Sequence, residues 1–225
     1  MTGTLYGVGV GPGDPELLTL KAVRIINECD LIAIPVSDKE TCVAYSIAKQ
    51  AIPEIKDKEI ISIEMPMVKD KAQLEESHKK GAQLLVKQLI KGKRIAFLTL
   101  GDPTVYSTYI YIHRLIIAAG YPTEIISGIP SFCAVAARLN DCLVEKAEPL
   151  HIIPSSYSIA DTLSLSGTKV YMKAGKKIGE VKKQLKSSGL KAIMIENCGM
   201  EQEKIYYSVD EIPEQAGYYS LIIVK

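Results

Sequence analysis

The chain has 225 residues, of which 47% are hydrophobic and 24% charged, as is ordinary for a globular protein with one large or two small domains. Its formal net charge of +1 argues against nucleic acid or an anionic membrane as a partner. The N-terminus has no signal-peptide pattern, and no apolar run approaches the roughly 20 residues of a membrane helix. We therefore expect a cytoplasmic protein with no membrane partner.

The first half of the chain alternates between the strand and helix patterns. Strands are expected at residues 4–10, 31–34, 59–63, 94–100 and 123–126, and helices at 15–29, 41–51, 71–90, 104–119 and 131–139. Asp14 is a suitable cap for the first helix, with Pro15 in its first turn. Such alternation builds βαβ units around a mostly parallel sheet, whose doubly covered strands appear as continuous apolar runs.

The second half of the chain is richer in strands. They are expected at residues 150–153, 169–172, 192–196, 204–209 and 218–224, with helical segments only near 159–165 and 178–187. Residues 210–217 join the last two strands, and this connection is too short for a parallel crossover, so it favours an antiparallel pair. We predict a smaller domain with a mixed sheet, and we divide the chain into domains 1–147 and 148–225.

Three glycine-containing turns each follow a predicted parallel strand. Their sequences are GVGVGPGDP (residues 7–15), LGDPT (100–104) and SGIPS (127–131). In open α/β sheets, ligands bind at the edge where such turns lie, because helix N-termini and exposed amides point there and glycine permits close approach. Asp102 has two interpretations, as the N-cap of a helix beginning at Pro103 or as an acceptor for a ligand's hydroxyl or ammonium groups. The two roles are compatible.

Several common sites do not match the sequence. The dinucleotide pattern Gly-x-Gly-x-x-Gly is incomplete, because the sixth position is Pro12 when counted from Gly7 and Asp14 when counted from Gly9. The five cysteines have no Cys-x-x-Cys spacing and the three histidines are far apart, so we expect reduced, mostly buried thiols and no metal site. Methyl transfer from a sulfonium remains compatible, since it needs positioning and desolvation more than a strong base.

Taken together and in this order, the turns resemble those of the tetrapyrrole (corrin/porphyrin) methylase family. The matching stretches are residues 7–22, 97–107 and 124–134, with later support at 170–172 and 195–199. Residues 101–107 and 149–155 resemble the branch that methylates C20, a meso carbon, of precorrin-2 or cobalt-precorrin-2 in cobalamin biosynthesis. The resemblance implies a small-molecule tetrapyrrole substrate, S-adenosylmethionine as cofactor with S-adenosylhomocysteine as product, and commonly a homodimer.

Pattern and resemblance together predict an α/β fold with two unlike domains and the cofactor cleft between them. The N-terminal domain has a mostly parallel five-stranded sheet and the C-terminal domain a mixed five-stranded sheet. The resemblance also implies cofactor contacts on the methionine and ribose side from Pro12, Leu100, Gly101, Asp102 and Val105, with Pro130 and Ser131 close by, and on the adenosine side from Met172 and Cys198.

Methylation of a tetrapyrrole at C20 would also require contacts between the protein and this substrate. Lys21, Arg24 and Arg138 are candidates for the carboxylates of the macrocycle, although each can equally be a solvated helix residue. Tyr106 is the candidate catalytic residue, to orient the ring or assist proton transfer, although simple packing would also explain it. The third turn departs from the family pattern, because Ser127 stands where a proline is usual, and we expect a slightly looser turn.

Three alternatives remain. The first is a methyltransferase of the same fold that acts at another ring position, on a protein or on RNA. The second is a nicotinamide-dependent oxidoreductase, which would bind NAD or NADP. The third is a non-catalytic sensor, which would bind S-adenosylmethionine without turnover.

Overall fold

The computed structural model describes residues 2–36, 38–66, 68, 70–154 and 159–225. It divides into two compact units, Met1–Pro130 and Ser131–Lys225, which we call unit 1 and unit 2. The boundary expected after residue 147 therefore falls inside unit 2. The reason is helix α5 (Ser131–Arg138), whose Val135 is buried in the same apolar cluster as Val170 and Ile195 of that unit. Ser155, at the end of one stretch used for the resemblance, lies outside the described residues.

Unit 1 contains a five-stranded sheet in the order β3-β2-β4-β1-β5, and all of its pairings are parallel. The strands are β1 (Leu5–Gly9), β2 (Leu31–Ile34), β3 (Glu59–Ser62), β4 (Ile95–Thr99) and β5 (Thr123–Ile126). Every residue of β2 and β4 is buried, as the continuous apolar runs of a doubly covered sheet require. The predicted parallel sheet is confirmed.

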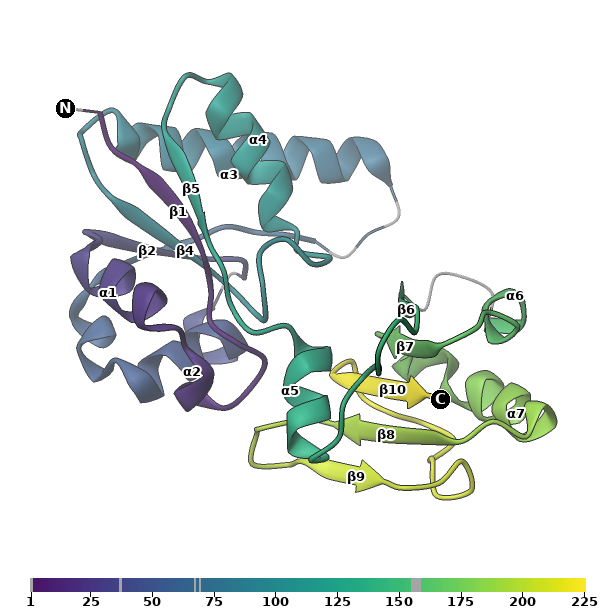
Figure 1. The fold of residues 1–225 in the computed structure, drawn as a ribbon. Helices are drawn as coiled ribbons and strands as arrows, with labels where there is room; N and C mark the ends of the chain where they lie inside the picture. Colours follow the sequence, from purple (N-terminus) through teal and green to yellow (C-terminus); the bar gives the residue numbers. More distant parts are fainter. Residues whose placement is uncertain (1, 37, 67, 69, 155–158) are drawn as a thin grey trace. The chain divides into compact units, whose positions relative to one another are not determined.

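Helices cover both faces of this sheet (Figure 1). One cluster of buried side chains contains residues of α1 (Leu20–Glu28) and α2 (Val43–Ala51), and the other contains residues of α3 (Lys71–Leu89) and α4 (Tyr109–Ala118). Three 3-10 helices complete the unit: η1 (Pro15–Leu17), η2 (Lys39–Thr41) and η3 (Pro53–Asp57).

Two helices of unit 1 begin later than expected. Asp14 does cap a helix, but this is the short η1, and α1 begins at Leu20 with Thr19 as its N-cap. The helix expected from residue 104 begins at Tyr109 instead. Tyr106 interrupts the pattern, because its φ of 49° lies in the left-handed region and cannot continue a right-handed helix.

Unit 2 contains a mixed sheet in the order β6-β7-β10-β8-β9. Its strands are β6 (Leu150–Pro154), β7 (Thr168–Met172), β8 (Ala192–Glu196), β9 (Lys204–Tyr206) and β10 (Ser220–Val224). Only β6 and β7 pair in parallel, and the other neighbours are antiparallel. Besides α5, the described part of unit 2 contains α6 (Ile159–Leu163), η4 (Gly175–Lys177) and α7 (Ile178–Ser188). The predicted mixed sheet is confirmed.

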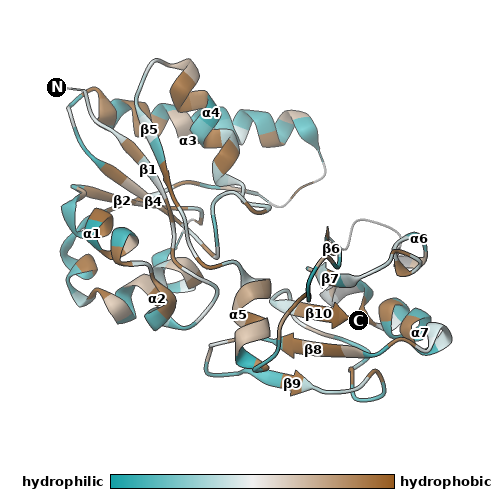
Figure 2. Cartoon of the chain, in the orientation of Figure 1, coloured by the Kyte–Doolittle hydropathy of each residue, from teal (hydrophilic) through white to brown (hydrophobic). Residues whose placement is uncertain are grey.

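The expected pairing of the last two strands is wrong. Strand β10 is buried along its whole length and lies between β7 and β8, whereas β9 is a three-residue strand at the edge. Figure 2 shows the hydrophobic colour along β8 and β10, against the more hydrophilic α7. The most apolar strand takes the centre because burial there stabilises most, so β9 and β10 are separated by β8.

Two further properties concern the whole of the described chain. Among the helices that the structure describes, none is both long and apolar enough to cross a membrane. All five cysteines are free, but only Cys29 and Cys42 are buried, so the expectation of mostly buried thiols is wrong. Burial raises the pKa of the Cys29 thiol to about 12, which keeps it protonated and unreactive at neutral pH.

Candidate functional site

The three glycine-containing turns leave unit 1 from one edge of its sheet. Strand β1 lies between β4 and β5, and their ends are in register, with Gly9 opposite Thr99 and Val8 opposite Ile126. The first turn (residues 10–14), the second (100–104) and the third (127–130) therefore begin side by side. This edge is where ligands bind in open α/β sheets.

The first and second turns are joined through two glycines. The Gly101 amide donates to the Gly11 carbonyl at 2.8 Å, and the Gly11 amide donates to the Gly101 carbonyl at 3.3 Å. Gly11 and Gly101 have φ values of 74° and 69°, a left-handed conformation that glycine adopts without steric cost. The pair forms an isolated antiparallel bridge that fixes one turn against the other.

The second and third turns are joined through the buried side chain of Asp102. Its Oδ1 accepts hydrogen bonds from the amide, at 2.7 Å, and the hydroxyl of Thr104, and its Oδ2 accepts one from the Gly128 amide at 2.9 Å. Asp102 therefore closes a local turn rather than capping a helix at Pro103, because α4 begins only at Tyr109.

The third turn is also tied to the start of α1. The hydroxyl of Thr19 accepts from the Ala22 amide at 3.1 Å and lies 3.4 Å from the Ser127 carbonyl oxygen, to which it donates. These contacts hold the turn although a proline is missing there. Thr19 and Gly128 were not expected from the sequence to be site residues. A threonine directly before an apolar helical pattern is a recognisable N-cap signal, whereas the contact to Ser127 has no local signature.

Of the six expected cofactor residues of unit 1, five lie on these turns and Val105 directly follows the second turn. Pro12, Gly101 and Asp102 are buried, and the other three are half-buried: Leu100, Val105 and Pro130. Unit 1 thus brings this set to one edge of its sheet.

The other three expected cofactor residues belong to unit 2. Ser131 is the first residue of α5, Met172 ends β7, and Cys198 follows β8. Met172 and Cys198 pack on the same apolar cluster, and β7 and β8 both flank β10, so these two strand ends lie at one edge of the unit 2 sheet. Lys173 and Asn197, next to these ends, have φ values of 60° and 51°, a sparsely populated conformation that is frequent at functional sites.

Tyr106 lies in a connection that is anchored on both sides. Before it, Asp102 binds Thr104; after it, the Ser107 hydroxyl lies 2.8 Å from that of Thr99 and accepts from the Tyr109 amide at 3.2 Å. Tyr106 is 48% exposed, and its backbone is left-handed. A large side chain held in a strained, anchored loop can contact a ligand reproducibly.

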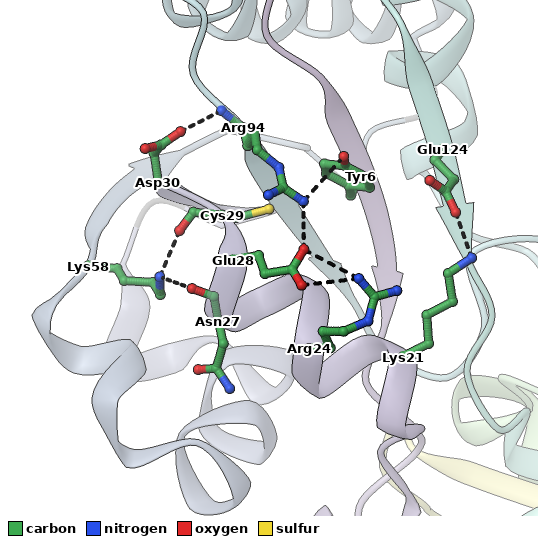
Figure 3. Close-up of polar contacts among 10 residues, drawn as sticks. All are labelled: Tyr6, Lys21, Arg24, Asn27, Glu28, Cys29, Asp30, Lys58, Arg94 and Glu124. Carbon is green, nitrogen blue, oxygen red and sulfur yellow. Dashed lines mark hydrogen bonds and ion pairs between the residues drawn. The ribbon is translucent and has the colours of Figure 1, made fainter.

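The three cations expected to meet a substrate are each paired with a glutamate. Lys21 contacts Glu124 at 2.6 Å in unit 1, and Arg138 contacts Glu203 at 2.7 Å in unit 2. Arg24 contacts Glu28 at 3.1 Å, and Figure 3 shows that Glu28 is shared with Arg94. A carboxylate ligand would compete with a glutamate at each position or share the cation with it.

The cluster around Glu28 has the chemistry of a structural ion pair. Hydrogen bonds from Arg94 and then Arg24 hold the pKa of Glu28 below its usual value. Arg94 also lies over the ring of Tyr6, with its guanidinium carbon 5.4 Å from the ring centroid. Lys58 binds the carbonyls that end α1, as Figure 3 shows. These contacts explain Arg94 and Lys58 without a ligand.

Unit 2 contains a cavity of about 420 Å³ at the end of α5. Its wall is mainly apolar, and it contains the ion pair between Lys225 and Asp141, 2.6 Å apart. The apolar lining includes Ala136, Leu139, Leu190, Ala192, Ile193, Val209 and Ile223. None of the residues assigned to the cofactor, the substrate or the reaction lines it.

Among the described residues, no cluster of three or more histidine, cysteine or acidic side chains has the geometry of a metal site.

The fold agrees with the comparisons to known proteins. Residues 4–213 match the family model Tetrapyrrole (Corrin/Porphyrin) Methylases, and the chain belongs to this family. It is 37% identical, over 98% of its length and 95% of the relative's, to the probable cobalt-precorrin-2 C(20)-methyltransferase of Methanocaldococcus jannaschii. It is 30% identical to the cobalt-precorrin-2 C(20)-methyltransferase of Salmonella typhimurium, over 100% of this chain and 97% of the relative.

A solved structure shows the same fold. The uroporphyrin-III C-methyl transferase from Thermus thermophilus, complexed with S-adenyl homocysteine, superposes with a TM-score of 0.71 at 22% identity. The match covers 98% of this chain and 96% of that protein.

Proposed function

We propose that this protein transfers a methyl group from S-adenosylmethionine to C20 of precorrin-2, in its cobalt-containing form, during cobalamin biosynthesis. The observation that carries the proposal is the interlocked set of three turns at one sheet edge, in a chain that matches C(20)-methyltransferases over nearly its full length. Any cobalt would be part of the substrate.

The residues at the turns fit such a cofactor. S-adenosylmethionine carries a cationic sulfonium and an ammonium group, and the second turn holds a carboxylate, Asp102. Gly101 leaves its backbone uncovered, because a Cβ there would meet only the Ile129 carbonyl oxygen, at 3.9 Å. We propose that Pro12, Leu100, Gly101, Asp102, Val105 and Pro130 border the methionine and ribose portions. Ser131, Met172 and Cys198 would add contacts from unit 2, the last two to the adenosine, mainly through backbone groups.

The proposed reaction asks little acid–base chemistry of the protein. The bound cofactor supplies an electrophilic methyl group, and the electron-rich carbon of the macrocycle is itself the nucleophile. The turns would orient the reactants and exclude water, which can supply much of the rate acceleration without a strong base. Tyr106 would orient the macrocycle or assist the loss of its proton. Tyr106→Phe separates these roles, because only proton transfer requires the hydroxyl and would lower kcat with KM unchanged.

The carboxylates of the substrate would be recognised by cations already in ion pairs. We propose that Lys21, Arg24 and Arg138 exchange their glutamate partners for carboxylates of the macrocycle. Exposed ion pairs are worth only about 0–1 kcal/mol, so the exchange costs little. Lys21 and Arg138 have side chains 52% and 56% exposed and are therefore accessible for it.

We further propose that the protein acts in the cytoplasm as a homodimer. Support for both comes from the family resemblance. Light scattering of the purified chain would give twice the mass of one copy, and a mass equal to one copy would overturn the dimer.

The direct test is anaerobic incubation with S-adenosylmethionine and precorrin-2, with and without cobalt, followed by mass spectrometry. Gain of one methyl group on the cobalt form, placed at C20 by carbon NMR, is the expected result. Gain on the metal-free form alone would move the proposal to that substrate. No gain on either form, with S-adenosylhomocysteine still bound, would leave a different substrate or a sensor.

A further inference from the structure

The carboxylate of Asp102 does more than a turn-closing side chain requires. Its Oδ1 closes the local turn by accepting from Thr104, which is sufficient for the local geometry. Its Oδ2 reaches Gly128, which is 26 residues further along the chain and follows a different strand. Asp102 is only 7% exposed, so both oxygens act within the protein.

Gly128 is buried, and its backbone is packed closely against the two other turns. A Cβ on Gly128 would lie 2.2 Å from the Gly101 carbonyl oxygen and 2.8 Å from Gly9, so the three backbones are in contact. A buried amide that is left without an acceptor is costly in free energy. The hydrogen bond from Gly128 to Asp102 is therefore required for this close packing.

The contacts form one continuous connection across the edge of the sheet. Gly11 is bridged to Gly101, the next residue Asp102 accepts from Gly128, and Thr19 donates to the neighbouring Ser127 carbonyl. A carboxylate offers about four acceptor positions, and the protein fills three of them. Most of the capacity of Asp102 is thus committed before any ligand arrives.

We propose that Asp102 is a positioning residue, whose carboxylate locks the third turn against the second and so arranges the backbone groups of both turns in advance. Toward a cofactor this inference rests on the proposed function, since it assumes that S-adenosylmethionine binds at these turns. The lock itself is a property of the free protein. Arranging a site in advance lowers the cost of binding, so loss of the lock weakens affinity in addition to any contact that Asp102 itself makes with the ligand.

The test compares three variants of the full chain without ligand, by hydrogen exchange of single amides. Asp102→Ser keeps a good cap for Thr104 but has one oxygen on a shorter side chain, which cannot reach Gly128. Asp102→Asn keeps the size, yet its NH2 group must replace one of the two acceptors, so either Gly128 or Thr104 loses its bond. Thr104→Val is the matched control, because it removes a hydroxyl donor and leaves the carboxylate in place.

We expect exchange at Gly128 to be faster by about tenfold to a hundredfold in Asp102→Ser, the equivalent of one hydrogen bond to a charged group. Exchange at Gly128 stays unchanged in Thr104→Val. In Asp102→Asn, at least one of the Gly128 and Thr104 amides loses protection from exchange. This variant also takes the place of Asp102→Ser if the serine variant does not fold. Unchanged protection of both amides in a folded Asp102→Asn would overturn the lock.

Calorimetry with S-adenosylhomocysteine then tests the positioning role. We expect the affinity for S-adenosylhomocysteine to fall in every variant in which the Gly128 amide loses protection. It should stay unchanged in a variant in which only the Thr104 amide loses protection. Lost affinity with full protection of Gly128 would show direct contact with the ligand and refute the positioning role. If the unmodified protein does not bind S-adenosylhomocysteine, the proposed function fails, while the exchange data still decide whether the lock exists.

Discussion

Units 1 and 2 are both built on five-stranded sheets, but they prepare their strand ends in different ways. In unit 1 the three turns touch one another, and a Cβ on Gly9 or Gly128 would lie within 2.8 Å of the backbone of a neighbouring turn. In unit 2 the residues next to the ends of β7 and β8 are Lys173 and Asn197. Both have a left-handed backbone conformation although they are not glycines. Contact between backbones requires glycine, whereas ends that stand apart can carry side chains at some cost in strain.

The two sheets also place their central strands differently. The centre of unit 1 is formed by β1 and β4, which are joined through long connections with helices. The centre of unit 2 includes β10, the last strand of the chain, inserted between two earlier strands. Each turn of unit 1 is local, but sheet order brings the three turns together, as it brings together Met172 and Cys198 in unit 2.

The largest expected effect tests the central place of β10. Ile222 is fully buried in the cluster beneath α7, and Ile222→Ala should lower the free energy of unfolding by about 2–5 kcal/mol through the cavity it leaves. The matched change on the edge strand is Ile205→Ala, where the side chain is half-buried and the loss should be less than half as large. Urea unfolding of both variants measures the difference, and equal losses would contradict the strand order.

Next in size is a test of close packing in unit 1. A Cβ on Gly7 would lie 2.0 Å from the ring of Tyr109, which is fully buried, so Gly7→Ala should destabilise by about 3 kcal/mol or more. Gly189 in unit 2 has open space around it and a φ of 68°, so Gly189→Ala should cost only about 1 kcal/mol of backbone strain. Adding Tyr109→Leu should recover part of the loss at Gly7, and a further loss instead would show that the ring is not the cause.

The sequence predicted both sheets, because strand and helix periodicity reflect burial directly. It missed where α4 begins, since the left-handed backbone of Tyr106 arises from the bonds of Ser107 and Asp102 and not from the propensity of tyrosine. It also paired the last two strands wrongly, because connection length limits which strands can be adjacent but does not show that an apolar strand will take the centre. Gly128 was missed because its partner is 26 residues away.

A smaller expected effect is a difference between the two units in how their stability depends on pH. Burial lowers the pKa of His78, which stacks on Tyr111, and also lowers that of His113, which lies beside Arg114. A histidine whose folded pKa is below its ordinary 6.5 binds protons more readily when unfolded, so unit 1 should lose stability as pH falls below 6.5. Hydrogen exchange in peptides of α3 and α4 would detect this loss, and His78→Gln should reduce it.

In unit 2 the titration is expected at lower pH. The pKa values of Asp141 and Asp210 are lowered by hydrogen bonds from Lys225 and Lys186, and these pairs stabilise the fold only above the ordinary aspartate value of 3.8. Their stability is lost as pH falls from there through the folded pKa. Between pH 6.5 and 5, peptides of α3 and α4 should therefore lose protection while those of α7 do not. Equal losses in both units would contradict the assignment to the histidines.

The smallest expected change in stability concerns the paired cations, and it shows which unit meets the substrate. Glu124→Gln releases Lys21 in unit 1, and Glu203→Gln releases Arg138 in unit 2. Each should change the free energy of unfolding by about 1 kcal/mol or less, because exposed ion pairs contribute little. If the cations serve carboxylates of the macrocycle, each release removes a competitor, and KM for the tetrapyrrole should fall. Lys21→Met and Arg138→Met should raise KM, and a unit in which neither change alters KM does not use that cation to bind substrate.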